Sequence, residues 1–168
     1  MGSEGQEVSN RPDRPAHVGG VEDIESVIDR FDDVEDREGL RALVDAARAF
    51  LGDQRWVISV SDLWWGTGVL PKVGVFLARI EADEDADEFL WTVVGDLPSA
   101  YLVVDDLSNP LEALEAHCDY MEEWVTAVCT GDGLVDVMPT GSDPTKENAV
   151  LLEARVRLIR RWVSEGVL

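Results

Sequence analysis

Few side chains in this sequence have the type and spacing of a catalytic group. The best candidate is His117, which shares one stripe of a predicted helix with Tyr120 and Trp124. A histidine beside a carboxylate can act as a general base. At about 100° per residue, however, Glu115 and Asp119 fall on other sides of this helix. We therefore expect the three residues to pack at the edge of the core, and the alternative is that they line a pocket.

Carboxylates occupy the side of the same predicted helix that lies opposite its apolar row, which includes Leu114, Cys118 and Met121. No lysine or arginine of the helix lies among them, so the sequence predicts a row of acid without compensation. Such a row attracts a cationic surface and repels anions. We therefore expect it to bind a basic protein partner through Glu112, Glu115, Asp119, Glu122 and Glu123.

A second candidate for partner binding is the segment 62–72, which reads as a loop or broken edge because two glycines and a proline interrupt it. It contains Asp62 and the adjacent tryptophans Trp64 and Trp65. Successive side chains of an extended segment point to opposite sides, so both rings cannot enter the same core. We expect one ring to be exposed or to line a groove, where aromatic residues carry binding energy. The alternative is that the two rings cover opposite faces of a sheet edge.

No residues have the spacing of a metal or cofactor site. The acidic run 81–88 lacks the central glycine and closing glutamate of a calcium loop, so we expect it to be solvated. Cys118 and Cys129 lie about 16 Å apart along the predicted helix, too far for a disulfide, and read as small core residues in a reducing cytosol. No nucleophile elbow, zinc spacing or dinucleotide fingerprint occurs. The sequence predicts no metal, no cofactor and no catalytic residue, and it favours a protein that is not an enzyme.

The charge of the chain limits its partners. There are 35 acidic residues against 14 basic ones, a formal net charge of −21. A field of this sign makes binding to nucleic acid or to an anionic membrane unfavourable. The sequence contains no run of about 18 apolar residues, the length needed to span a membrane. Its N-terminus lacks the apolar core of a signal peptide, so we expect a cytoplasmic protein. The excess of aspartate, with arginine in place of lysine, also resembles the composition of salt-adapted or GC-rich microbes, which would give the acidity an environmental cause. The sequence carries no prediction of the oligomeric state.

Hydrophobic periodicity predicts the elements that must position these residues. Residues 1–19 are expected to be a disordered tail, and residues 20–168 a single domain. Asn109, followed by Pro110 and Glu112, marks the start of the helix that carries the acid row. The expected strands are 55–61, 73–80, 89–94 and 101–104, and the expected helices are 21–31, 38–51 with Asp36 as N-cap, 110–130, and 144–165.

The last predicted helix carries the one basic cluster of the sequence: Arg155, Arg157, Arg160 and Arg161. These arginines suit the negative end of the helix dipole, and they could also face the acid row and compensate it. Arg155 projects close to the centre of the apolar arc, so it should either extend its head to solvent or meet a buried carboxylate. That arc is formed by Leu151, Leu152, Leu158, Ile159, Trp162 and Val163.

These patterns together predict an α+β fold. We expect an antiparallel meander of about four strands packed against two long C-terminal helices, with two shorter N-terminal helices beside them. The predicted function is a soluble, acidic protein-interaction module, such as an inhibitor or immunity-type protein, for a basic partner. The alternative is a small enzyme or small-molecule-binding domain with a pocket between the sheet and the helices, near Trp64, Trp65, His117 and Trp124.

Overall fold

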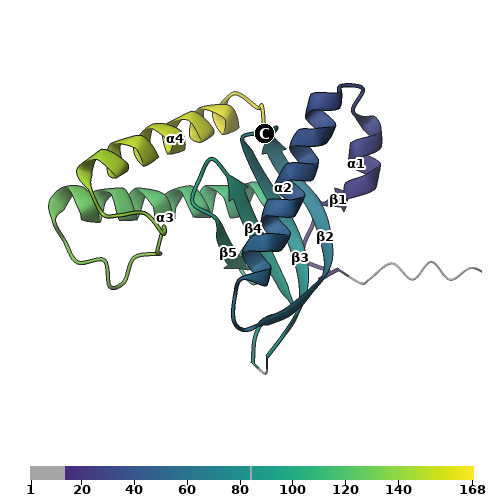
Figure 1. Cartoon of the computed structure of the whole chain (residues 1–168), viewed down its shortest axis with the longest axis horizontal. Helices are drawn as coiled ribbons and strands as arrows, with labels where there is room; N and C mark the ends of the chain where they lie inside the picture. The colour runs from purple at the N-terminus through teal and green to yellow at the C-terminus, as the bar shows by residue number, and fades with distance from the viewer. Residues whose placement is uncertain (1–13, 84) are drawn as a thin grey trace, which may run out of the picture.

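Four strands follow one another between residues 57 and 103 with no helix between them, which forces each pair of neighbours to be antiparallel. The structure, a computed structural model, describes residues 14–83 and 85–168. A fifth strand of two residues pairs with the outer side of the first, opposite Trp64 and Trp65. In sheet order the strands are β1 (Glu22–Asp23), β2 (Val57–Val69), β3 (Val73–Ala82), β4 (Phe89–Gly95) and β5 (Ala100–Val103). The predicted α+β meander is therefore confirmed (Figure 1).

The sheet separates two hydrophobic cores. Because side chains alternate along a strand, Val75, Leu77 and Trp91 enter one core, whereas Phe76 and Ala78 enter the other. The first core is closed by the two C-terminal helices and the second by the two N-terminal helices. Figure 1 shows these pairs as α1 (Ile24–Arg30) with α2 (Val34–Gly52), and α3 (Pro110–Thr130) with α4 (Lys146–Ser164).

Local signals determine where α3 begins and ends. The Asn109 side chain accepts a hydrogen bond from the backbone N–H of Glu112 at 3.0 Å, and Pro110 occupies the first turn. The Glu112 carboxylate in turn accepts from the backbone N–H of Ser108 at 2.7 Å. Gly131 ends the helix with φ +76°, a conformation that glycine adopts without steric cost. The predicted boundaries of this helix are confirmed.

Other helix boundaries differ from the prediction. The Asp33 side chain caps α2 by accepting from the backbone N–H of Glu35 at 2.7 Å. The helix therefore begins at Val34, before the expected cap Asp36, and reaches the length of α4. The first turn of α2 is exposed to solvent, with Val34 62% exposed. It therefore has no buried apolar residues whose spacing could mark the start of the helix in the sequence. For α4, Thr145 supplies the cap.

The predicted disordered tail falls partly outside the described residues, which begin at Arg14. The last residues of that segment contact the rest of the domain. The backbone N–H of Gly19 donates to the Ser108 carbonyl at 2.8 Å, and Nε2 of His17 lies 3.2 Å from the Val104 carbonyl oxygen. These bonds hold residues 14–19 against the connection between β5 and α3.

Residues 62–72 are predicted to be a loop or broken edge. Residues 62–69 instead form the second half of β2, so the loop is wrong there, and only residues 70–72 make a turn. The glycines of β2 mark close contacts within the sheet. A Cβ atom on Gly66 would lie 2.5 Å from the Pro110 Cβ, and one on Gly68 would lie 2.2 Å from the Val73 carbonyl oxygen. Three register irregularities interrupt the pairing of β2 with β3, yet the two strands stay paired as far as Val69, although glycine is a poor strand former.

We predict that Gly66→Ala destabilises the fold by about 2 kcal/mol, because the added methyl group overlaps Pro110 and must displace the start of α3. Urea unfolding followed by tryptophan fluorescence measures the change. Gly52→Ala is the matched control, since a Cβ there meets no atom within 4 Å and the residue ends a helix. The control should leave stability equal or slightly higher; equal losses in both variants would contradict the proposed overlap.

Candidate partner-binding face

The five carboxylates predicted on one side of α3 all point to solvent. We call this surface the α3 acid face, formed by Glu112, Glu115, Asp119, Glu122 and Glu123. The opposite side of the helix is sealed against the sheet and α4, with Leu114, Cys118 and Met121 buried. The outward direction of the acid row is therefore confirmed.

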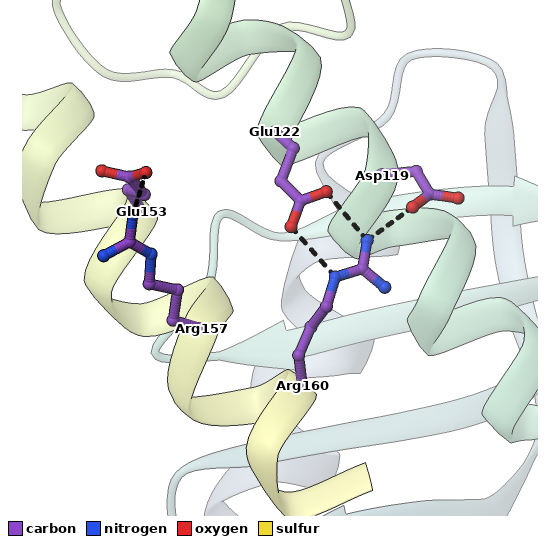
Figure 2. A network of polar contacts seen from close by, with 5 residues as sticks. All are labelled: Asp119, Glu122, Glu153, Arg157 and Arg160. Atoms are coloured by element: carbon purple, nitrogen blue, oxygen red, sulfur yellow. Dashed lines mark hydrogen bonds and ion pairs between the residues drawn. The ribbon is translucent and has the colours of Figure 1, made fainter. Parts of the chain in front are cut away.

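The α3 acid face is partly compensated, which the helix's own sequence did not predict. Arg160 of α4 reaches across and donates from Nε to Glu122 at 2.9 Å and from an Nη to Asp119 (Figure 2). The hydrogen bond to Glu122 is the main cause that raises the pKa of Arg160, so its charge is permanent. This contact confirms that an arginine of the last helix faces the acid row. It also corrects the expectation that the row is without compensation.

The remaining carboxylates of the face differ in their surroundings. The Ser108 backbone N–H and hydroxyl both donate to Glu112 and lower the pKa of its carboxyl, so this residue serves the start of the helix. Glu115 and Glu123 have no ion pair within the described part of the chain. These two exposed carboxylates are therefore the ones on the face that neither Arg160 nor Ser108 contacts.

His117 lies in the core and is fully buried, deeper than the expected core edge. Its Nε2 donates to the Pro98 carbonyl at 2.9 Å, since a carbonyl oxygen can only accept. Nδ1 has no hydrogen-bond partner among the described residues. Burial lowers the pKa of His117 to about 4, so the ring is neutral at pH 7. The side chain ties the β4–β5 connection to α3.

The pocket expected beside this histidine does not form at these residues. Trp124 is buried in the same core, whereas Tyr120 is 38% exposed. A small cavity of about 120 Å³ lies against Trp124, between Pro98 and α4, but neither His117 nor Tyr120 lines it. Pockets for small ligands usually have several hundred Å³, so this cavity is too small for most of them.

The two tryptophans of β2 point to opposite faces of the sheet. Trp65 is buried among the N-terminal helices and meets Phe76 edge-on at 5.3 Å between ring centroids. Trp64 lies on the α3 side, partly exposed, and stacks on Phe89 at 6.4 Å. The rings thus cover opposite faces near a sheet edge, as in the alternative, and the segment is a strand instead of a loop. Trp64 is also the partly exposed ring that was expected beside a groove. Trp64 and Asp62 also line an open groove of about 970 Å³ between β2 and residues 14–26.

Several predicted core positions of the C-terminal helices lie at the surface. Cys129 is exposed, so it is not the core residue expected, whereas burial raises the pKa of Cys118 to about 11 and keeps its thiol protonated. Leu151 and Leu158 are 52% and 40% exposed because α4 buries the adjacent side of its surface. Arg155 is exposed and donates to the Asp96 carbonyl at 3.3 Å. The buried residues of α4 are Ala149, Leu152, Val156 and Ile159.

The residues that sequence reasoning missed are those whose role comes from a distant segment. Residues 14–19, most of which line one wall of the groove, read as a tail because they contain little to bury. Across residues 14–83 and 85–168, no three histidine, cysteine or acidic side chains gather as a metal site. No helix in the described part of the chain combines the length and apolar character needed to cross a membrane.

Comparisons of this chain with protein-family models, with curated proteins and with solved structures find no match. No relative therefore supplies a role for any residue of the α3 acid face. A function has to be inferred from the residues and their geometry.

We predict that the buried His117 makes stability depend on pH. Its pKa is about 4 in the folded chain and 6.5 ordinarily, so between these values the unfolded chain binds a proton that the folded chain excludes. The contribution of His117 to the free energy of unfolding is therefore fully present above pH 6.5. It is lost as the pH falls to about 4, a change of about 3 kcal/mol.

His117→Gln tests this, because glutamine can still donate to Pro98 but does not titrate. Unfolding free energies measured by urea at neutral pH and near pH 4 should fall less in the variant than in the parent. The carboxylates contribute equally to both proteins, so identical pH dependence would contradict the role of His117.

Proposed function

We propose that this chain is an acidic protein-interaction module whose α3 acid face binds a basic protein, in the manner of an inhibitor or immunity-type protein. The observation that supports this most is the exposed pair Glu115 and Glu123, which has no ion pair within the described residues. Both carboxylates stand on a rigid helix whose other side is packed in the core. A partner would therefore meet charges that need little reorganisation to bind.

The charge of the whole chain supports the same proposal. A net charge of −21 creates a long-range field that accelerates encounter with a cationic surface and rejects anionic ones. The local charge has the same sign, because five carboxylates against the single Arg160 leave four negative charges on the α3 acid face. Such complementarity gives speed and specificity of association more than affinity.

Arg160 gives the face a defined geometry. Its guanidinium bridges Asp119 and Glu122, one turn apart on α3, and holds both carboxylates in place (Figure 2). All three side chains remain partly exposed, with Arg160 at 36% and Asp119 at 66%. A partner's arginine or lysine could thus share these oxygens without breaking the existing bridge, since each carboxylate accepts several hydrogen bonds.

The small-molecule alternative has less support from the geometry. Its predicted location needs His117 and Trp124 around a cavity, yet both pack into the core. The groove near Asp62 and Trp64 is open and has no unpartnered buried polar side chain among its lining residues. We therefore propose only the binding of a basic protein partner.

We predict that neutralising the pair weakens binding to a basic partner about fivefold, which corresponds to about 1 kcal/mol for two exposed charges. The variant is Glu115→Gln with Glu123→Gln. The matched control is Glu38→Gln with Asp45→Asn, which changes the net charge equally on exposed positions of α2. Basic proteins retained from a microbial extract at low salt are identified, and their affinity for each variant is measured by interferometry.

A second pair of variants tests the bridge. Arg160→Gln releases Asp119 and Glu122 and should tighten binding, whereas Arg157→Gln removes the same charge from the outer side of α4 and should change it less. Binding must also weaken as salt rises. If no basic protein is retained at low salt, or if the α2 control loses as much affinity as the α3 variant, the proposal fails.

A further inference from the structure

An apolar and basic strip on the outer side of α4 has no cover among the described residues. Val150, Leu151 and Leu158 are 60%, 52% and 40% exposed, and Ala154 between them is exposed as well. Figure 1 shows α4 along the margin of the molecule, with α3 on its inner side. The buried residues of α4 lie on that inner side. Exposed apolar residues gathered on one helix face are a sign of an interface.

The order of residues on this strip is symmetric about Ala154. Val150 and Leu158 each lie four residues from it, which is about one turn along the same face. Glu147 and Arg161 each lie seven residues from it, which is about two turns, and they have opposite charges. Both are exposed, and neither has an ion pair among residues 14–83 and 85–168.

We propose that α4 binds a second copy of this chain, with the two helices antiparallel and a twofold axis passing at Ala154. In that arrangement each residue on the N-terminal side of Ala154 faces the residue equally far on the C-terminal side in the other copy. Val150 then packs on Leu158 of the second copy, and Glu147 meets Arg161, twice each. The small Ala154 side chains lie at the crossing and let the two backbones approach closely.

The remaining charges of α4 fit the same arrangement. Arg157 faces Leu151 of the second copy, and its aliphatic stem can cover that side chain. Its guanidinium is held along its own helix by Glu153 at 2.7 Å, as Figure 2 shows. Arg160 points away from the strip, toward α3. The dimer therefore leaves the α3 acid face of each copy open and does not depend on the proposed function.

Other occupants fit the strip less well. An anionic membrane or a nucleic acid would meet the arginines but would be repelled by a chain of net charge −21. An acidic protein would leave Glu147 opposite like charge. A second copy satisfies both Glu147 and Arg161 and covers the apolar residues between them. One helix per copy makes a small interface, so the dimer is expected to be weak and reversible.

Sedimentation velocity of the full chain, from micromolar to near-millimolar concentration at physiological salt, should show a monomer–dimer equilibrium. Leu158→Glu should weaken it about tenfold or more. Arg161→Glu and Glu147→Arg should each weaken it about tenfold by placing like charges together, and the double variant should restore the parent equilibrium. The control is Arg48→Glu, at an exposed position of α2. It changes the net charge by the same amount as Arg161→Glu and should leave the dimer intact.

Cross-linking locates the axis. Ala154→Cys in a Cys129→Ser background should form a disulfide-linked dimer under mild oxidation, whereas Ala46→Cys on α2 should not. A chain that is monomeric at every concentration overturns the proposal, as does a dimer that none of the α4 variants changes. Retention of a monomeric chain by polyglutamate through Arg161 would assign the strip to an acidic partner and would also overturn it.

Discussion

The contact of α3 with β2 at Gly66 is the constraint on which the rest of the C-terminal half depends. Pro110 packs where a side chain on residue 66 would lie, so the first turn of α3 sits directly on the strand. Once the start of the helix is placed there, its apolar side must cover the central strands. Its acid side then has only one direction left, toward solvent and α4. The missing side chain of Gly66 thus determines where α3 lies and, with it, which way the α3 acid face points.

The two cores explain why the N-terminal helices are needed. β3 is buried on both faces, which its continuous run of apolar residues from Val73 to Leu77 anticipates. A sheet of this kind is unstable unless both faces are covered, and α1 with α2 close the second face. His117 and Trp91 show how polar atoms are accommodated inside: Nε2 of His117 donates to Pro98, and the indole N–H of Trp91 donates to Leu107 at 2.8 Å.

Charge is distributed unevenly over the two C-terminal helices. α3 presents carboxylates, and α4 carries all four arginines that follow residue 79 in the chain. Arg160 joins the two helices, because it is the one that points inward to Asp119 and Glu122. The outer side of α4 therefore combines exposed leucines with Arg157, which is paired with Glu153, and Arg161, which has no ion pair among the described residues. The α3 acid face is the surface that we propose for a cationic protein, and the outer side of α4 is the one that we propose for a second copy.

Sequence alone determined the features that depend on neighbours in the chain. The start of α3 at Asn109–Pro110, its end at Gly131 and the antiparallel pairing of β4 with β5 all follow from local hydrogen bonding, capping and short connections. The outward direction of Glu115 and Asp119 also followed, since periodicity separates the two sides of a helix.

Only the tertiary structure decided which of several apolar sides is buried and which charges meet. On α4 the apolar residues span a wide arc, and packing on α3 selected Leu152 and Ile159 while it left Leu151 and Leu158 outside. The segment around Gly66 reads as a broken edge because glycine disfavours strands, yet the approach of Pro110 requires it there. Arg160 and Asp119 lie 41 residues apart, and no local pattern can pair them. Periodicity describes one element, whereas burial and ion pairing depend on the element packed against it.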